Sequence, residues 1–305
     1  MSSSPSGVVA CSGAPRDLGL DQGRAASAAV RAAAGALPLA TRLGVGGGAH
    51  ARQSARDAVH HFPHMSERLA GLARGAGVSR GALAALLARE LGGGAGAAAA
   101  ALPERTGAGA LVARTLPPGG WIVRRSAPEH DWASVEIAMP WLVPAFAGVN
   151  RAGLAVAAVV SAPAPGSCVA NAAPALLLAQ DCLQRWDTVQ KAIEWCERRP
   201  AGGTAVLLLA DAQGDAVEIQ VRGTERGLRR AEGGVLATAG DPSAAADLAK
   251  ALREGARGPA ALAEAVLAPA ALEAAVGRGA PCAILDPAAR TLAIGGTLYS
   301  AAEGA

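Results

Sequence analysis

The order of periodic segments constrains this chain more than any other feature of its sequence. Helical periodicity prevails over about the first hundred residues, and short apolar runs bounded by Pro, Gly and Asn follow from residue 110 onward. Helical segments return at 172–185 and 187–199, and strands follow at 205–210 and 216–221. Because helices and strands alternate in blocks, the pattern predicts two layers of sheet covered by helices.

Local signals mark the boundaries of several elements. A short strand ending at Ala10 and a turn precede a helix that begins near Pro15, and Pro63 ends a helical stretch that starts near Ala51. Asp187 and Thr188 are placed to cap the helix that follows them. The other predicted elements are helices at 65–74, 79–90, 243–254 and 270–275, and strands at 110–113, 121–123, 135–139, 154–160, 282–285 and 291–294. The run of Gly and Ala at 92–101 is interpreted as a loop.

Composition and charge are those of an ordinary soluble globular protein. The 305 residues are 51% hydrophobic and 17% charged, which is enough apolar material for a full core. A formal net charge of +3 with scattered Arg residues argues against nucleic-acid binding, because it forms no basic patch. No apolar run reaches the roughly 20 residues that span a bilayer. The apolar run before Cys11 lacks the preceding basic residue that a signal peptide needs. We therefore expect a cytoplasmic protein that binds neither nucleic acid nor a membrane.

The cysteines and histidines predict neither a metal site nor a cofactor. The cysteines lack metal-ligand spacing, and their odd number argues against a disulfide framework; they are Cys11, Cys168, Cys182, Cys196 and Cys282. Buried free thiols are therefore expected. His60, His61 and His64 lie close in sequence, but Pro63 interrupts the helical spacing, so we interpret them as a solvated helix end.

Four segments resemble one known family in their order and intervals. They are a glycine-spaced strand-to-helix turn at 13–23, a proline-led helix and turn at 62–78, a turn and strand at 148–156, and a hairpin at 207–218. Each motif alone occurs in many folds, whereas the set is colinear from about residue 13 onward. On these segments the chain resembles the acyl-coenzyme A:6-aminopenicillanate (isopenicillin N) acyltransferase group of N-terminal-nucleophile hydrolases.

The resemblance implies an α+β fold, a four-layer αββα sandwich with a helical N-terminal third. We expect a single domain over residues 1–305, with a mostly helical segment at 13–100 and the sandwich core at 106–305. Members of such a family cleave or transfer acyl groups at amide bonds. They cut their own precursor before a cysteine, whose free α-amine then serves as the base. The implied partners are small acyl, amide or peptide-like ligands or a protein, and no cofactor is implied.

The nucleophile that the family requires is missing from its expected position. In the family it opens the first core strand, ahead of an Arg-Asn-x-Asp-like segment. With the strand at 110–114 and the later segment at 124–132, the expected position is Ala108, whose neighbours Gly107 and Gly109 also carry no nucleophilic atom. The sequence therefore predicts that self-cleavage and acyl-enzyme formation are lost.

A second family feature is also missing. The stretch that supplies an oxyanion-stabilising Asn corresponds here to Thr238-Ala239-Gly240-Asp241, which offers no amide side chain. The turns at Asn150 and Asp211 are retained, and we interpret them as parts of the scaffold that folding needs. Glu218, in an alternating strand, is expected to point to solvent or to have a structural role.

The alternative interpretation is an active enzyme whose nucleophile lies at a different position. Thr106 could be a displaced nucleophile, because Thr serves this purpose in other N-terminal-nucleophile enzymes, although an offset of two residues moves a side chain roughly 7 Å along a strand. Asp131 corresponds best to the family's active-site-proximal aspartate, with a turn cap before Trp132 as its structural alternative. Arg125, Trp132 and Thr238 are the candidate ligand-binding residues of the remnant or active site.

Overall fold

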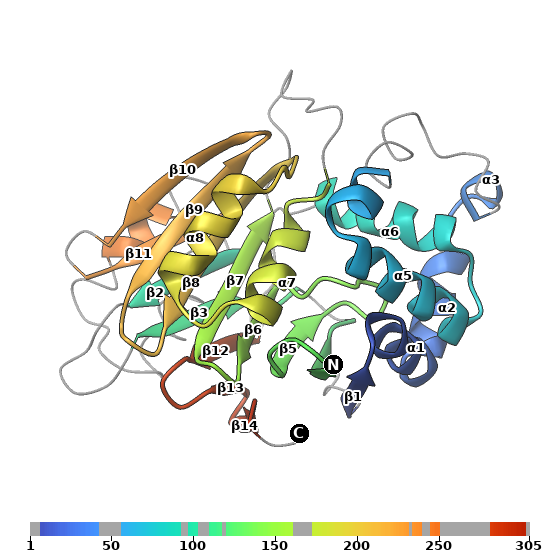
Figure 1. The fold of residues 1–305 in the computed structure, drawn as a ribbon, viewed down its shortest axis with the longest axis horizontal. Helices are drawn as coiled ribbons and strands as arrows, with labels where there is room; N and C mark the ends of the chain where they lie inside the picture. Colours follow the sequence, from blue (N-terminus) through green and yellow to red (C-terminus); the bar gives the residue numbers. More distant parts are fainter. Residues whose placement is uncertain are drawn as a thin grey trace.

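Two β-sheets packed face to face form the centre of the molecule (Figure 1). The computed structural model describes residues 7–42, 56–92, 97–102, 110–117, 120–160, 173–231, 234–239, 245–250 and 281–302. The larger sheet contains, in spatial order, β1 (Val8–Gly13), β4 (Ile122–Pro128), β5 (Ser134–Ala138), β6 (Ala147–Asn150), β7 (Leu154–Val160), β8 (Thr204–Asp211), β9 (Ala216–Arg222) and β10 (Glu225–Arg230). The smaller sheet contains β11 (Leu236–Ala239), β2 (Ala98–Leu102), β3 (Leu111–Thr115), β12 (Cys282–Asp286), β13 (Thr291–Ile294) and β14 (Thr297–Ser300).

Helices lie in two groups around these sheets. The N-terminal group contains α1 (Pro15–Ala25), α2 (Ser27–Gly35), α3 (Leu39–Arg42), α5 (Pro63–Ala76) and α6 (Arg80–Gly92). The later group contains α7 (Leu176–Arg185) and α8 (Val189–Arg198), which cover the outer face of the larger sheet (Figure 1). Residues 56–61 and 245–250 are also helical. Among the described strands only β1 pairs in parallel, with β4, and the other strand pairs are antiparallel.

The period of two in β2 gives the smaller sheet an inner and an outer face. Ala99 and Ala101 belong to the main core between the sheets, whereas Ala98 and Ala100 belong to a second cluster with Leu248 of the helical segment 245–250. Successive layers are therefore the α7 and α8 helices, the larger sheet, the smaller sheet and this helical segment. The predicted four-layer αββα arrangement is confirmed.

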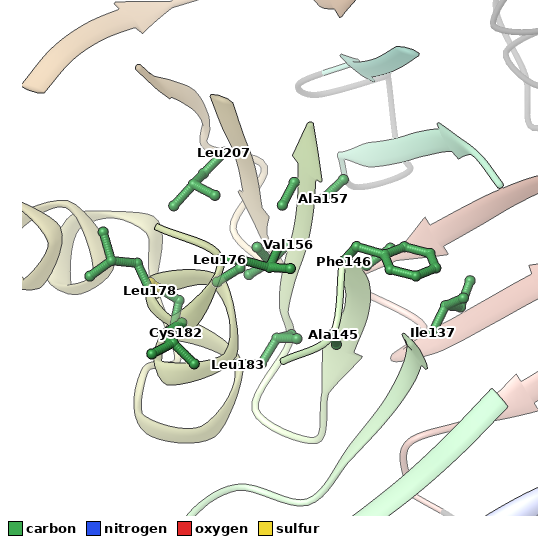
Figure 2. Packing of buried hydrophobic residues seen from close by; sticks show 14 of the residues in the cluster. Ile137, Ala145, Phe146, Val156, Ala157, Leu176, Leu178, Cys182, Leu183 and Leu207 are labelled. Atoms are coloured by element: carbon green, nitrogen blue, oxygen red, sulfur yellow. The ribbon is translucent and has the colours of Figure 1, made fainter. Parts of the chain in front are cut away.

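The main core lies on both sides of the larger sheet. In Figure 2, Leu176, Cys182 and Leu183 of α7 lie on one side of Val156, and Phe146 lies on the other. Arg114 of β3 crosses from the smaller sheet, placing its guanidinium 4.4 Å from the Phe146 ring centroid and donating from Nε to the Ala158 carbonyl at 2.8 Å. Burial lowers the pKa of Arg114 to about 10, so the side chain remains a cation between the two sheets.

Glycines let α1 and α5 approach until their backbones touch. A β-carbon on Gly19 would lie 1.9 Å from the Arg68 carbonyl oxygen, and one on Gly71 would lie 1.9 Å from the Arg16 carbonyl oxygen. No side chain fits at such a distance. The spacing of the glycines in the segments 13–23 and 62–78 is therefore a requirement of helix packing. Gly23 and Gly75 repeat the same contact one turn further along.

A fully buried polar network joins the N-terminal helices to the larger sheet. Arg124 of β4 donates from Nε to Glu136 at 2.7 Å, from Nη1 to the Gln22 side chain at 2.6 Å, and from Nη2 to the Gln180 side chain at 3.0 Å. Burial acts to raise the pKa of Glu136, but Arg124, Arg68 and two side-chain hydrogen bonds outweigh it and lower the pKa to about 2. The Arg124–Glu136 pair therefore stays ionised inside the protein.

Arg68 of α5 adds a second buried guanidinium to this network. Its Nη2 donates to Ser126 Oγ at 2.9 Å, while Nε and Nη1 meet no hydrogen-bond partner among the described residues. Burial, followed by repulsion from Arg124, lowers the pKa of Arg68 to about 10. Two cations thus face the single carboxylate of Glu136.

The scaffold roles predicted for Asn150 and Asp211 are confirmed. Asn150 Nδ2 donates to the carbonyls of Leu183 and Trp186 at 2.9 and 2.7 Å, and its Oδ1 accepts from Leu154 N. Asp211 Oδ1 accepts from the backbone of its own turn, and Oδ2 accepts from Val189 N at 2.9 Å. Both side chains therefore fix where α7 and α8 meet the sheet.

Most predicted elements match the structure, with one consequential error. The interpretation of 92–101 as a loop is wrong for its end, because Ala98–Leu102 is strand β2 and is buried throughout. Sheet strands therefore begin before residue 106, and β1 also belongs to the larger sheet. Strands β6, β10, β11 and β14 were not predicted, and the predicted helix at 270–275 lies outside the described residues. That residues 1–305 form one domain stays a prediction.

Candidate functional site

A cavity of about 530 Å³ opens between the two sheets at the β10 and β11 edge. Its walls come from β8, β9 and β10 of the larger sheet, from β11 of the smaller sheet and from the helical segment 245–250. The lining residues are Thr204, Ala205, Val206, Glu218, Gln220, Val221, Arg222, Arg229, Ala237, Thr238, Ala239, Ala245, Ala246 and Ala249.

Strand alternation explains why polar side chains meet at this place. Glu218 and Gln220 are two residues apart on β9, and their cross-strand partners on β8 are Leu208 and Val206. Residues with this spacing share one face of a sheet. The neighbouring Ile219 belongs to the buried apolar core. The expectation that Glu218 points to solvent is wrong, since the residue is only 1% exposed.

The charges on the cavity floor neutralise one another. Arg229 Nη2 forms an ion pair with Glu218 Oε2 and also donates to the Ala237 carbonyl at 2.8 Å. Gln220 Nε2 donates to the other Glu218 oxygen at 2.7 Å. The Glu218 carboxylate is therefore held in place by β10 and by its own strand, and Arg229 ties β10 to β11.

The head of β2 lies beside the same cavity. Ala98 pairs with Ala239, and Ala99 pairs with Thr238, so the first residues of β2 run next to two residues of the cavity wall. On its other side Ala98 meets Thr115, whose Oγ1 accepts from Ala98 N at 3.0 Å and donates to Ala98 O at 3.3 Å. The first strand after the helical third is therefore β2, and it begins at the cavity with alanine.

The candidate ligand-binding residues do not come together. Thr238 lines the cavity, whereas Arg125, Asp131 and Trp132 lie on β4 or in the turn after it. The sheet order places β4 four strands from β8, which is roughly 19 Å at the usual strand spacing. Trp132 is 37% exposed and donates its backbone N–H to the Gln184 carbonyl. Ligand binding by Arg125, Trp132 and Thr238 stays a prediction, and so does the active-site role of Asp131.

Thr106 and Ala108 lie outside the described residues. The strands that flank them are described, and Leu102 pairs with Leu111 at the end of the hairpin away from Ala98. The assignment of the nucleophile position to Ala108 assumed that the strand beginning near residue 110 was the first of the core. Because β2 precedes it, that assumption is wrong.

The residues that form this site carry little signal in the sequence. Glu218 lies on β9, where apolar and polar residues alternate clearly, whereas Arg229 lies on β10, where three of the six residues are Arg and there is no alternation. The five residues of β2 are four alanines and a leucine, so hydropathy does not alternate along them. Burial of β2 depends on the sheets and helix that surround it.

His64 lies in a separate cluster between α5 and α7. Its Nε2 is 2.7 Å from Asp181 Oδ1, and the other Asp181 oxygen accepts from Trp195 Nε1 at 3.0 Å. The interpretation of His64 as a solvated helix end is therefore wrong. Within the described residues, no group of three His, Cys, Asp or Glu side chains is placed to hold a metal ion.

Comparison with solved structures identifies proteins similar to this chain. One is an N-acylethanolamine-hydrolyzing acid amidase ortholog from Caenorhabditis elegans, with 12% identity, coverage of 62% of this chain and 93% of that chain, and a TM-score of 0.50. The chain shares the αββα fold of this amidase ortholog. Penicillin V acylase from Agrobacterium tumefaciens matches at 14% identity over 67% of this chain and 84% of that chain, with a TM-score of 0.44. A mutant of conjugated bile acid hydrolase from Clostridium perfringens matches at 13% identity over 67% of this chain and 91% of that chain, with a TM-score of 0.41.

Other comparisons set the limits of this relationship. No family model and no curated protein matches the chain. Among the described residues, no helix combines the length and apolar character needed to cross a membrane. A cytoplasmic location stays a prediction.

Proposed function

We propose that this protein is a homologue of the acyl-coenzyme A:6-aminopenicillanate acyltransferases that has lost self-cleavage and acyl-enzyme chemistry, and that its cavity binds a small acyl or amide ligand. The observation that carries the proposal is the head of β2. The resemblance requires a nucleophilic cysteine where the first core strand opens, and Ala98 occupies that place beside the cavity. An alanine can neither attack a carbonyl nor activate the peptide bond before it.

The surrounding sequence offers no substitute for the missing thiol. Residues 92–103 consist only of Gly, Ala, Leu and Pro, so a shift of the position by several residues does not supply a nucleophile. Ala239 corresponds to the oxyanion-stabilising Asn of the family, and it pairs with Ala98 across the β11–β2 ladder. Two positions that such chemistry needs are therefore neighbours in the fold, and both carry a methyl group.

The cavity retains features that suit a small amphiphilic ligand. Its volume of about 530 Å³ lies within the range of small-molecule sites. Much of its wall is Ala and Val, which suits an acyl chain, while Thr238 and the exposed Arg222 offer hydrogen-bond donors to an amide or carboxylate. Loss of catalysis does not remove these contacts.

The mass of the purified protein tests the loss of self-cleavage. We expect one intact chain of 30.0 kDa after prolonged incubation, because no residue at the head of β2 can start an N-to-S acyl shift. Two fragments would overturn the proposal. A cut directly before Thr106, abolished by Thr106→Ala, would establish the active alternative with a displaced nucleophile.

Ligand binding is tested separately with N-phenylacetylglycine by saturation-transfer NMR. We expect binding without release of glycine, and weakened binding in Ala246→Trp, whose indole would occupy the cavity. Leu298→Trp is the matched control, since Leu298 is 65% exposed on β14 and does not line the cavity. Equal binding by wild type and Ala246→Trp would contradict the proposed site, and release of glycine would contradict the loss of catalysis.

A further inference from the structure

The thiols of Cys182 on α7 and Cys196 on α8 contact each other inside the molecule. Their Sγ atoms are 3.6 Å apart, and neither residue has exposed surface. The short connection from Trp186 to Thr188 folds α8 back along α7, which brings two cysteines 14 residues apart together. Figure 2 shows Cys182 on the side of α7 that packs among buried residues.

The two sulfurs are in van der Waals contact, with no heavy atom between them. Because a disulfide bond is about 2.05 Å long, a shift of roughly 1.5 Å along the line between the sulfurs brings them to bonding distance. We propose that Cys182 and Cys196 form a reversible disulfide bond, so that the pair is an oxidative modification site linking α7 to α8. This site is independent of the cavity and of the proposed function.

A small hydroperoxide is the class of oxidant that fits the site. One thiol sulfur attacks a peroxide oxygen, which gives a sulfenic acid and releases water when hydrogen peroxide is used. The second sulfur then displaces the hydroxyl group of the sulfenic acid, which forms the S–S bond and a second water. Each sulfur loses one electron, the two peroxide oxygens gain them, and both thiol protons leave in water.

The environment explains why the pair persists as thiols until it is challenged. The Cys196 contact and burial raise the pKa of Cys182 well above its ordinary value, so the thiol form predominates at neutral pH. Both thiols are fully buried, so oxidation includes a movement of α8 that admits the oxidant; the outward face of α8 carries the exposed Lys191 and Glu194. A thiol reductant entering by the same route would reverse the bond.

Peptide mapping of the folded, full-length protein tests the proposal. After hydrogen peroxide treatment, alkylation and trypsin, we expect peptide 192–198, which contains only Cys196, to be linked to peptide 152–185. Titratable thiols in denaturant should fall from five to three and return after dithiothreitol. Because peptide 152–185 also contains Cys168, the Cys168→Ser variant serves as the control and should retain the link.

Two variants identify the partners. Cys182→Ala and Cys196→Ala should each lose the cross-linked peptide. Circular dichroism measures whether both variants are folded. Full alkylation of Cys182 and Cys196 in the peroxide-treated wild type would overturn the proposal. A link between Cys168 and Cys196 that disappears in Cys168→Ser would overturn it as well, whether or not the alanine variants fold.

Discussion

Gly23 of α1 and Gly75 of α5 face each other so closely that a β-carbon on either would lie 3.0 Å from the Cα of the other. Gly19 and Gly71 approach the facing backbone more tightly still. Two turns of backbone are therefore in direct contact, and α1 also packs against β1 and β4. The segments 13–23 and 62–78, two of the four that resemble the acyltransferase family, are therefore packed against each other as one structural unit.

Substitution of Gly71 by alanine should destabilise the protein by roughly 3 kcal/mol or prevent folding, because the new methyl group meets backbone that cannot rotate away. Gly35→Ala is the matched control, since nothing lies within 4 Å of a β-carbon at that helical position. We expect the control to be neutral or stabilised by up to about 1 kcal/mol. Urea unfolding measures both, and equal midpoints for the two variants would contradict the proposed contact.

The free energy of unfolding should fall at low pH because the buried Glu136 carboxylate becomes protonated. Its pKa is about 2 when folded, below the ordinary 4.5, so the carboxylate stabilises the fold above pH 4.5 and this contribution disappears as pH falls toward 2. The loss is on the order of 3 kcal/mol. Glu136→Gln should remove this dependence and destabilise the protein by roughly 3 kcal/mol at pH 7, since Arg124 and Arg68 then remain buried without a counter-ion.

Urea unfolding at a series of pH values between 2 and 7 measures the effect. Asp187→Asn is the control for a carboxylate whose pKa is lowered by a Lys191 hydrogen bond at the surface. Because solvent screens this exposed pair, its removal should change the acid dependence little. If Glu136→Gln retained the full acid dependence of the wild type, the buried network would not be its cause.

Asn150→Ala should destabilise the protein by roughly 2 to 4 kcal/mol. The substitution leaves the carbonyls of Leu183 and Trp186 without the amide that now satisfies them. Gln190→Ala removes an exposed side-chain hydrogen bond to Glu194 and should cost less than about 0.5 kcal/mol. Thermal unfolding of both variants tests the difference, and similar melting temperatures would show that the Asn150 contacts contribute little.

Thr115→Val should weaken the head of β2 by about 1 kcal/mol or more, because Ala98 N loses the hydroxyl that accepts its hydrogen bond. Thr297→Val makes the same change at an exposed position on β14 and should be close to neutral. Hydrogen exchange at Ala98 should rise selectively in Thr115→Val. Unchanged exchange at that amide would argue against the Thr115 contact.

Several parts of this protein follow from sequence alone. Apolar runs identify β7, β8 and β9, the apolar stripe identifies α8, and Asn150 and Asp211 mark turns whose side chains bond to nearby backbone. Four colinear segments, at 13–23, 62–78, 148–156 and 207–218, carry the resemblance that implied the αββα sandwich. These features are local because periodicity, capping and turn chemistry act over a few residues.

Only the tertiary structure decided where the site lies. Ala98 to Ala101 have no periodic signal, and they form a buried strand because two sheets and a helix enclose them. The same packing brings Ala98 beside Ala239, and it places Arg125 on β4, four strands from the β8 wall of the cavity that Thr238 lines. Strand order and pairing depend on contacts between residues distant in sequence, so no local pattern could place the first core strand or the cavity next to it.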